Sequence, residues 1–122
     1  MDNVLEKFFV VEENETARMA GSGHLPVLST PHMIAYMENT ALNLLSKDLN
    51  DGETSVGIEI IAKHLNPTPV GREVTVKAQL IEQTKNMVTF EIEARSSDDI
   101  IGTASHTRAI VDEERFMKQL IE

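Results

Sequence analysis

Residues 73–96 read EVTVKAQLIEQTKNMVTFEIEARS, and apolar side chains alternate with polar ones on both sides of Lys85-Asn86. A period of two residues is the period of a β-strand, so this stretch predicts two strands joined by a turn. Each strand has one apolar face, made by Val74, Val76, Ala78 and Leu80 and then by Val88, Phe90, Ile92 and Ala94. The opposite faces are polar, which is typical of an antiparallel sheet covered on one side only.

Further strands are predicted on both sides of this hairpin. Val4–Val11 is rich in strand formers, and Ile100–Val111 reads as a last long strand. From Thr54 onward the period is also two, with one inward face formed by Val56, Ile58, Ile60, Ala62 and His64. The polar and Pro/Gly-rich stretches 66–71 and 96–99 predict the intervening turns.

One long helix is predicted from Ser29-Thr30-Pro31 to about Lys47, with Thr30 as the cap and Pro31 in the first turn. Its core face is expected to carry Met33, Ile34, Met37, Ala41, Leu44 and Leu45. The opposite, polar face is expected to carry His32, Tyr36, Asn39, Thr40 and Asn43. Thr16–Met19 predicts a short helical turn, and 112–121 predicts a short helix with Phe116, Met117 and Leu120 facing inward.

These elements predict a single α+β domain over residues 1–122, in which one long helix packs on a five-stranded antiparallel sheet. A single helix is too narrow to cover such a sheet. Apolar sheet surface or an unpaired edge strand should therefore remain, and dimerisation would bury it.

Composition excludes several classes of function. The net charge of −9 opposes nucleic-acid binding, and the absence of cysteine excludes disulfides and thiolate chemistry. No apolar run approaches the ~18 residues of a membrane span, and the first residues do not resemble a signal peptide. We therefore expect a cytoplasmic protein without membrane association.

Three residues could carry chemistry. Glu38 is the only charged side chain between Thr30 and Lys47, and it lies at the margin of the apolar face, where a carboxylate is costly unless it is paired or used. His64 ends an inward strand face and could meet the helix. Each has a plain structural alternative: a solvated helix-flank glutamate, a core histidine and, for Thr30, a helix cap. Thr30 and Glu38 are eight residues apart, about 12 Å along a helix, so they cannot touch directly.

Other catalytic patterns are missing from the sequence. There is no metal-binding histidine spacing, so we expect no metal. There is likewise no nucleophile elbow, no P-loop and no dinucleotide-binding glycine pattern.

The sequence resembles the hotdog-fold acyl-CoA thioesterases, in particular the branch that contains fluoroacetyl-CoA thioesterase. The resemblance rests on LPVLSTP at 25–31 leading into the helix with Glu38, on 57–71 with HLNPTPVG, and on HTRAIV at 106–111. It implies a helix wrapped by an antiparallel sheet, a homodimer or tetramer with its sites at the subunit interface, and Thr30, Glu38 and His64 as catalytic residues.

The resemblance also implies residues that contact substrate. Gly57 matches a glycine near the acyl group, and Arg108 matches an arginine of the last strand. We further expect Lys63, Arg72 and Arg108 to meet the phosphates of CoA, and Met19 and Leu28 to line the acyl pocket. Thr107 and Ala104 depart from the Glu and Gly common in the family. Met19, His24 and Leu28 stand where the fluoroacetyl-specific enzyme closes its pocket with aromatic side chains, which argues against fluoroacetyl-CoA as the natural substrate.

The predicted reaction is hydrolysis of an acyl-CoA thioester, with CoA entering as part of the substrate and no other cofactor. Glu38 would act as general base or as nucleophile, His64 would move protons, and Thr30 would polarise the carbonyl or attack it. The alternative is a non-catalytic module that binds or senses acyl-CoA. A hydratase is disfavoured because the Asp and His pair of such enzymes is not found here.

Overall fold

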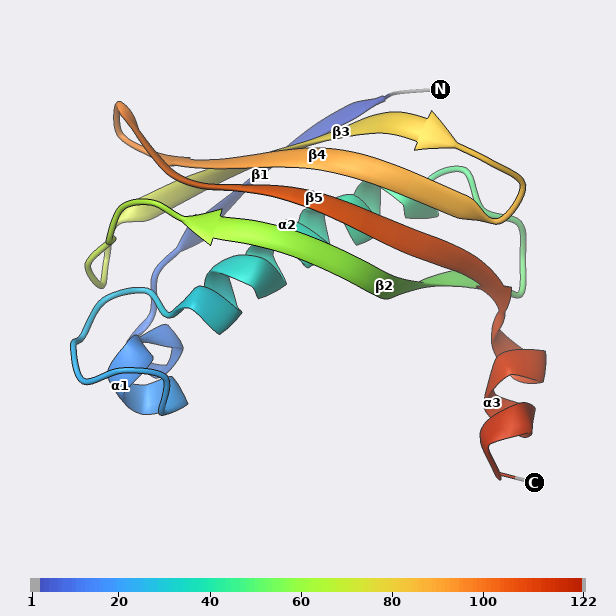
Figure 1. Ribbon diagram of the computed structural model, residues 1–122, viewed down its shortest axis with the longest axis horizontal. Coiled ribbons are helices and arrows are strands. Elements are labelled where there is room, and N and C mark those ends of the chain that lie inside the picture. The colour runs from blue at the N-terminus through green and yellow to red at the C-terminus, as the bar shows by residue number, and fades with distance from the viewer. Residues whose placement is uncertain (1–2, 122) are drawn as a thin grey trace.

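The computed structural model describes residues 3–121, which form one five-stranded sheet and a long helix (Figure 1). The elements in chain order are β1 (Val4–Val10), the 3-10 turn η1 (Glu13–Glu15), α1 (Ala17–Ala20), α2 (Thr30–Ser46), β2 (Glu53–His64), β3 (Glu73–Gln83), β4 (Met87–Ser96), β5 (Asp99–Asp112) and α3 (Glu113–Ile121). The strand order is β1-β3-β4-β5-β2, and all neighbours are antiparallel. The predicted α+β architecture is confirmed.

The core lies between α2 and the face of the sheet that α2 crosses (Figure 1). Val74, Val76 and Ala78 of β3 and Val88, Phe90 and Ala94 of β4 have no exposed surface, as their alternation predicts. Met33 and Met37 of α2 fill the space above them. This layer fixes α2 rigidly over the sheet, so the polar groups at its margins have defined positions.

The predicted inward face of β2 is wrong in its first half. The pairing of β2 with β5 shifts register between Gly57 and Glu59, and this bulge reverses the alternation. Ser55 is buried on the helix side, whereas Ile58, expected inside, is 49% exposed. Beyond the bulge, Ile60, Ala62 and His64 are partly buried, as predicted.

The start of α2 also differs from the prediction. Ser29, not Thr30, is the N-cap: its Oγ accepts a hydrogen bond from the His32 backbone N–H at 3.1 Å, and Pro31 follows in the first turn. Because the cap is one residue earlier, the Thr30 hydroxyl is available for other contacts.

The buried face of α2 is wider than predicted because β1 packs on its polar side. Tyr36 is 5% exposed and stacks on Phe9 with 4.3 Å between ring centroids, while its hydroxyl donates a hydrogen bond to Glu15 at 2.5 Å. Thr40 is buried too and bonds to the Tyr36 carbonyl. Ile34, predicted to lie in the core, is only partly buried.

The C-terminal helix α3 extends away from the sheet at the end of β5 (Figure 1). Its apolar residues were expected to face inward, but Met117 is 52% and Leu120 66% exposed, and only Phe116 is partly buried. The prediction is wrong in this chain because α2 and the sheet lie out of reach. Within residues 3–121, no helix has the length and apolar character needed to cross a membrane.

Candidate active site

Two groups of polar side chains lie at the margins of α2, and the first is formed by Thr30 and His64. Thr30 Oγ1 lies 2.8 Å from His64 Nδ1, a hydrogen-bond distance, where the first turn of α2 meets the end of β2. A hydroxyl bonded to an imidazole is the arrangement that acyl-transfer enzymes use to move a proton. Thr30 is exposed, so a substrate can approach this pair from solvent.

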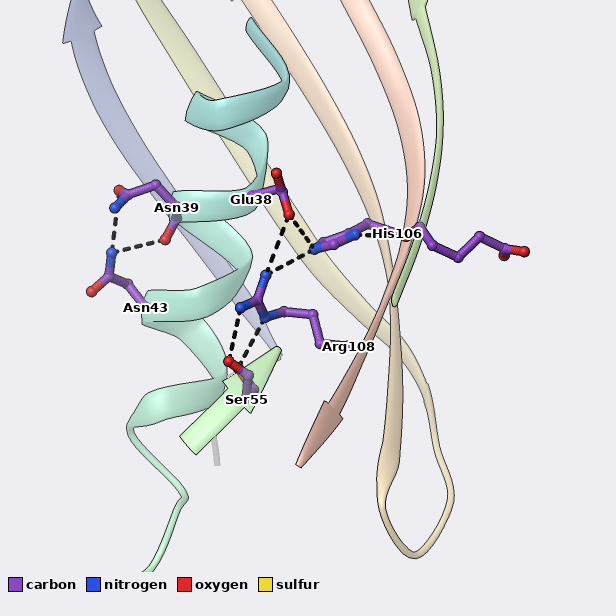
Figure 2. Close-up of polar contacts among 7 residues, drawn as sticks. Glu38, Asn39, Asn43, Ser55, His106 and Arg108 are labelled. Atoms are coloured by element: carbon purple, nitrogen blue, oxygen red, sulfur yellow. Dashed lines mark hydrogen bonds and ion pairs between the residues drawn. The ribbon is translucent and has the colours of Figure 1, made fainter. Parts of the chain in front are cut away.

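The second group surrounds Glu38, two turns further along α2 (Figure 2). Glu38 Oε2 lies 3.8 Å from Arg108 Nη1 and 4.0 Å from His106 Nε2, both on β5. The Glu38 side chain is 41% exposed, whereas those of His106 and Arg108 are 1% and 7% exposed. The carboxylate is therefore held against a buried cation and still meets solvent.

Gly57 makes room for this carboxylate. A Cβ atom built on Gly57 would lie 2.7 Å from Glu38 Oε2 and 3.2 Å from His106 Cε1. Any side chain at position 57 would therefore displace Glu38. Gly57 thus supports the second group by being small, and it lies beside the bulge that redirects β2.

Arg108 is the most constrained member of the second group. Its Nε donates to Ser55 Oγ at 2.9 Å, its Nη2 donates to the Ser55 carbonyl at 3.1 Å, and its Nη1 lies 3.1 Å from His106 Nε2 (Figure 2). These bonds fix the plane of the guanidinium and direct Nη1 toward Glu38.

Within one chain the two groups remain apart. Among residues 3–121, no hydrogen bond or ion pair joins Glu38 to Thr30 or to His64, in agreement with their spacing along α2. The structure therefore brings Thr30 and His64 together, and separately brings together Glu38, Gly57 and Arg108.

The remaining predicted residues lie elsewhere. Lys63 lines a hollow of about 450 Å³ on the sheet face opposite α2, together with Lys77 and Gln79 among others. Arg72 is exposed just before β3. Met19 is 65% exposed on α1, and Leu28 is 1% exposed and packs in the core. Their proposed contacts with substrate stay predictions.

Sequence reasoning missed two members of the second group, His106 and Ser55. The signal for His106 was present, because it stands two residues before Arg108 on a strand and must share its face. No comparable signal marked Ser55, since the bulge that turns it inward is a property of strand pairing.

Burial lowers the pKa of one histidine in each group. It lowers the pKa of His64, with a smaller opposing effect from the Asn66 backbone. It also lowers the pKa of His106, where the hydrogen bond with the Glu59 backbone opposes the effect and the charge of Arg108 adds to it. Both imidazoles are therefore neutral near pH 7 and able to accept a proton or a hydrogen bond. Among residues 3–121, no three side chains of metal-ligating type cluster together.

Comparison with known proteins shows that the chain is similar to acyl-CoA thioesterases. A family model described as "Fluoroacetyl-CoA-specific thioesterase" matches residues 11–114, which contain every side chain of both groups. The fluoroacetyl-CoA thioesterase of Streptantibioticus cattleyicolor is 32% identical over 90 residues, which make up 74% of this chain and 65% of that protein. The match thus spans just under two thirds of that relative's length.

Solved structures give the same relationship. The fluoroacetyl-CoA thioesterase FlK matches with a TM-score of 0.92 and 28% identity, covering 96% of this chain and 91% of that chain. A variant of FlK in complex with fluoroacetate and CoA matches with a TM-score of 0.88 and 28% identity, covering 93% of this chain and 95% of that chain. The predicted hotdog fold is confirmed.

Proposed function

The chain belongs to the fluoroacetyl-CoA-specific thioesterase family, and from this premise we propose that it hydrolyses an acyl-CoA thioester to a free acid and CoA. The observation that carries the proposal is the 2.8 Å contact between the Thr30 hydroxyl and His64 at the first turn of α2. Thioester hydrolysis needs a proton-transfer pair and positive potential for the developing oxyanion, and a helix N-terminus beside such a pair supplies both.

In the proposed reaction Glu38 acts as the general base. It removes a proton from water, the water oxygen bonds to the acyl carbon, and the C–S bond then breaks. His64, which is neutral, accepts this proton from Glu38 and passes a proton on to the departing CoA sulfur, so that both side chains return to their starting state, while Thr30 donates a hydrogen bond to the carbonyl oxygen. The distances of 3.8 and 4.0 Å from Glu38 Oε2 to Arg108 and His106 support this role, because they leave the carboxylate free to bond water.

We further propose that each active site is shared by the two subunits of a homodimer. Thr30 and Glu38 are both needed at one acyl group, yet they lie about 12 Å apart along one helix. Glu38 of a second copy can complete the site where Glu38 of the same chain cannot. The edge strand β2 offers the surface for such pairing, since it exposes Ile58 and Ile61 by 49% and 64%.

Recognition of CoA requires cations, because CoA carries phosphates. Lys63 and Arg72 are exposed and remain our candidates for these contacts, whereas Arg108 is 6% exposed and bonded to Ser55 and His106. Replacing either by Glu is expected to raise KM several-fold with kcat unchanged, and an unaltered KM would remove that residue from the proposal. The reaction needs no cofactor besides the CoA of its substrate, and we place it in the cytoplasm, where acyl-CoA is made and used.

The primary test measures thiol release from a panel of acyl-CoAs. The panel runs from acetyl and fluoroacetyl to palmitoyl and includes branched and aryl acids. Turnover on one class of chain supports hydrolysis and defines the acyl pocket. If no member is hydrolysed but one binds, as judged by calorimetry, the chain is an acyl-CoA binding module and the hydrolase proposal is wrong.

The shared site has its own test, which mixes two inactive variants. Thr30→Ala and Glu38→Gln each damage both sites of a homodimer, whereas their heterodimer has one site with neither change. Unfolding and refolding the mixed variants should therefore restore up to about one quarter of wild-type activity, because half of the dimers are mixed and half of their sites are intact. As a control for refolding yield, Glu38→Gln is mixed with Glu91→Gln in place of Thr30→Ala; Glu91 is exposed on the outer face of the sheet. If the control mixture is active but the mixture of Thr30→Ala and Glu38→Gln recovers no activity, one chain supplies both groups.

A further inference from the structure

His106 is a fully buried histidine that the proposed reaction does not use. It is 1% exposed on β5, and both of its ring nitrogens are engaged. Its Nδ1 lies 2.8 Å from the Glu59 carbonyl, and its Nε2 lies 3.1 Å from Arg108 Nη1. Burying two polar atoms in a core is costly, and here each has one specific partner.

The two partners determine the tautomer of His106. A carbonyl oxygen can only accept, so Nδ1 carries the hydrogen and donates it to Glu59. Arginine can only donate, so Nε2 is the acceptor for Nη1 of Arg108. A protonated ring would have no lone pair for Arg108 and would set two cations side by side. The neutral ring therefore acts as a hydrogen-bond acceptor aimed at the guanidinium.

The anchor for this ring is the bulge in β2. Glu59 is the first residue paired with β5 after the register shift, and it lies opposite Thr107, next to His106. The same bulge places Gly57 against the Glu38 carboxylate. One irregularity in β2 thus shapes both the space for Glu38 and the orientation of His106.

Counting donors shows what His106 contributes to Arg108. Two sides of the guanidinium are held by Ser55, through Nε and Nη2. The Nη1 group has two hydrogens: one is donated to His106 Nε2, and the other is left on the side of Glu38, 3.8 Å from Oε2. If position 106 offered no acceptor where Nε2 now lies, the Nη1 end of the Arg108 side chain would no longer be held in place.

We propose that His106 is a positioning residue for Glu38, which acts by holding Nη1 of Arg108 beside the Glu38 carboxylate. The charge of Arg108 then orients the carboxylate toward the water that it activates. This inference rests on the proposed thioesterase function only for its effect on rate. Its structural content, the dependence of Arg108 on the acceptor at position 106, is independent of any activity.

Two substitutions of similar size each keep only one of the two hydrogen bonds of His106. In His106→Gln, the amide oxygen can reach the position of Nε2 and accept from Arg108. In His106→Asn, the shorter amide can donate to Glu59 from the position of Nδ1 but does not reach Arg108. A residue that is merely structural would tolerate Asn no worse than Gln, whereas a positioning residue requires the acceptor that only Gln restores.

The expected result is a fall in kcat of about 10- to 100-fold for His106→Asn, the size expected when a catalytic group is displaced by about 1 Å, with KM within threefold. His106→Gln should recover most of kcat. In a Glu38→Gln background, His106→Asn should lower kcat no further, because the group being positioned is gone. Thermal melts of all variants report whether they fold.

A readout that needs no substrate completes the test. Side-chain NMR of ¹⁵N-arginine-labelled protein should show resolved, slowly exchanging Nη signals of Arg108 in wild type and in His106→Gln, and their averaging in His106→Asn. If the signals behave so but no acyl-CoA is hydrolysed, the positioning inference holds and the proposed function fails. If the protein hydrolyses acyl-CoA and His106→Asn matches wild type in kcat, the positioning inference is wrong.

Discussion

The hydroxyl of Thr30 and the Nδ1 atom of His64 are 2.8 Å apart although 34 positions separate the two residues in the chain. The contact depends on the cap of α2 being Ser29, which satisfies the helix start and leaves Thr30 free. It also depends on the bulge in β2, which returns His64 to the helix side of the sheet after Ile58 has turned outward. Local features of two distant segments therefore build one proton-transfer pair.

Removing either member of this pair should impair the chemical step. We expect Thr30→Ala and His64→Ala each to lower kcat by about 100-fold, the usual loss for a general acid or base. Thr30→Ala should leave the melting temperature nearly unchanged, because Thr30 is exposed. The same loss of kcat is expected for Glu38→Ala. Thiol release measures the effect, and Thr84→Ala, at an exposed position just after β3, is the control. Wild-type rates in all three variants would refute the site.

Adding one methyl group at Gly57 should act on Glu38. The new Cβ would lie 2.7 Å from Glu38 Oε2, too close for the carboxylate to keep its place. We expect Gly57→Ala to lower kcat at least about 10-fold through displacement of the catalytic group. The fold should survive, since the partly exposed side chain of Glu38 can move aside. Thr84→Ala, at an exposed position just after β3, is the control and should leave kcat unchanged; equal effects of the two substitutions would contradict the role of Gly57.

Protonation of buried histidines should make stability fall in mild acid. Burial lowers the pKa of His64 and of His106 below the ordinary value of 6.5. Below pH 6.5 the unfolded chain therefore binds more protons than the folded one, so the free energy of unfolding decreases as the pH falls through this window and levels off above it. Urea titrations at several pH values between about 5.5 and 7.5 measure the slope.

Two variants test whether His64 causes this pH dependence of the free energy of unfolding. His64→Gln should reduce the pH dependence of the free energy of unfolding, whereas Thr84→Ala, which removes no titratable group, should leave it unchanged. Activity should follow the same sign, because a proton-accepting His64 must be neutral, so kcat/KM should drop on the acid side of pH 6.5. A kcat/KM that rises with acid would exclude this role.

How far the sequence predicts the structure depends on whether the signal is local. The strand β3 keeps a period of two as far as Ala78, before its register shift between Leu80 and Glu82, and β4 keeps it from Val88 to Ala94; every inward residue predicted in these two stretches is buried. The period in β2 is broken by a bulge, which exists only through pairing with β5, so the alternation predicts the wrong face for Ile58. Likewise Tyr36 is buried by β1, a contact that no helical periodicity contains.

The candidate site, like the fold, is predictable from the sequence only where its signal is local. Thr30, Glu38 and His64 stood out because each is a polar group at the start or margin of an apolar element, and Gly57 and Arg108 came from the resemblance. The network around Arg108 was not foreseen, because it needs Ser55 turned inward and His106 beside the bulge. Side chains that act through another side chain leave little trace in a single sequence.

The exposed edge strand β2 should form the interface of the proposed dimer. In the strand order β1-β3-β4-β5-β2, strands β1 and β2 have unpaired edges, and Ile58 is 49% exposed on the second of them. A lysine on an edge strand opposes pairing because its charge would have to be buried. If β2 forms the dimer interface, Ile58→Lys should sediment as a monomer and lose thiol release, since each proposed site needs Glu38 of the second copy. Phe8→Lys, a change of a 65% exposed residue on β1, should remain dimeric and active. The reverse pattern, with Phe8→Lys monomeric and Ile58→Lys dimeric, would move the interface to the opposite edge of the sheet.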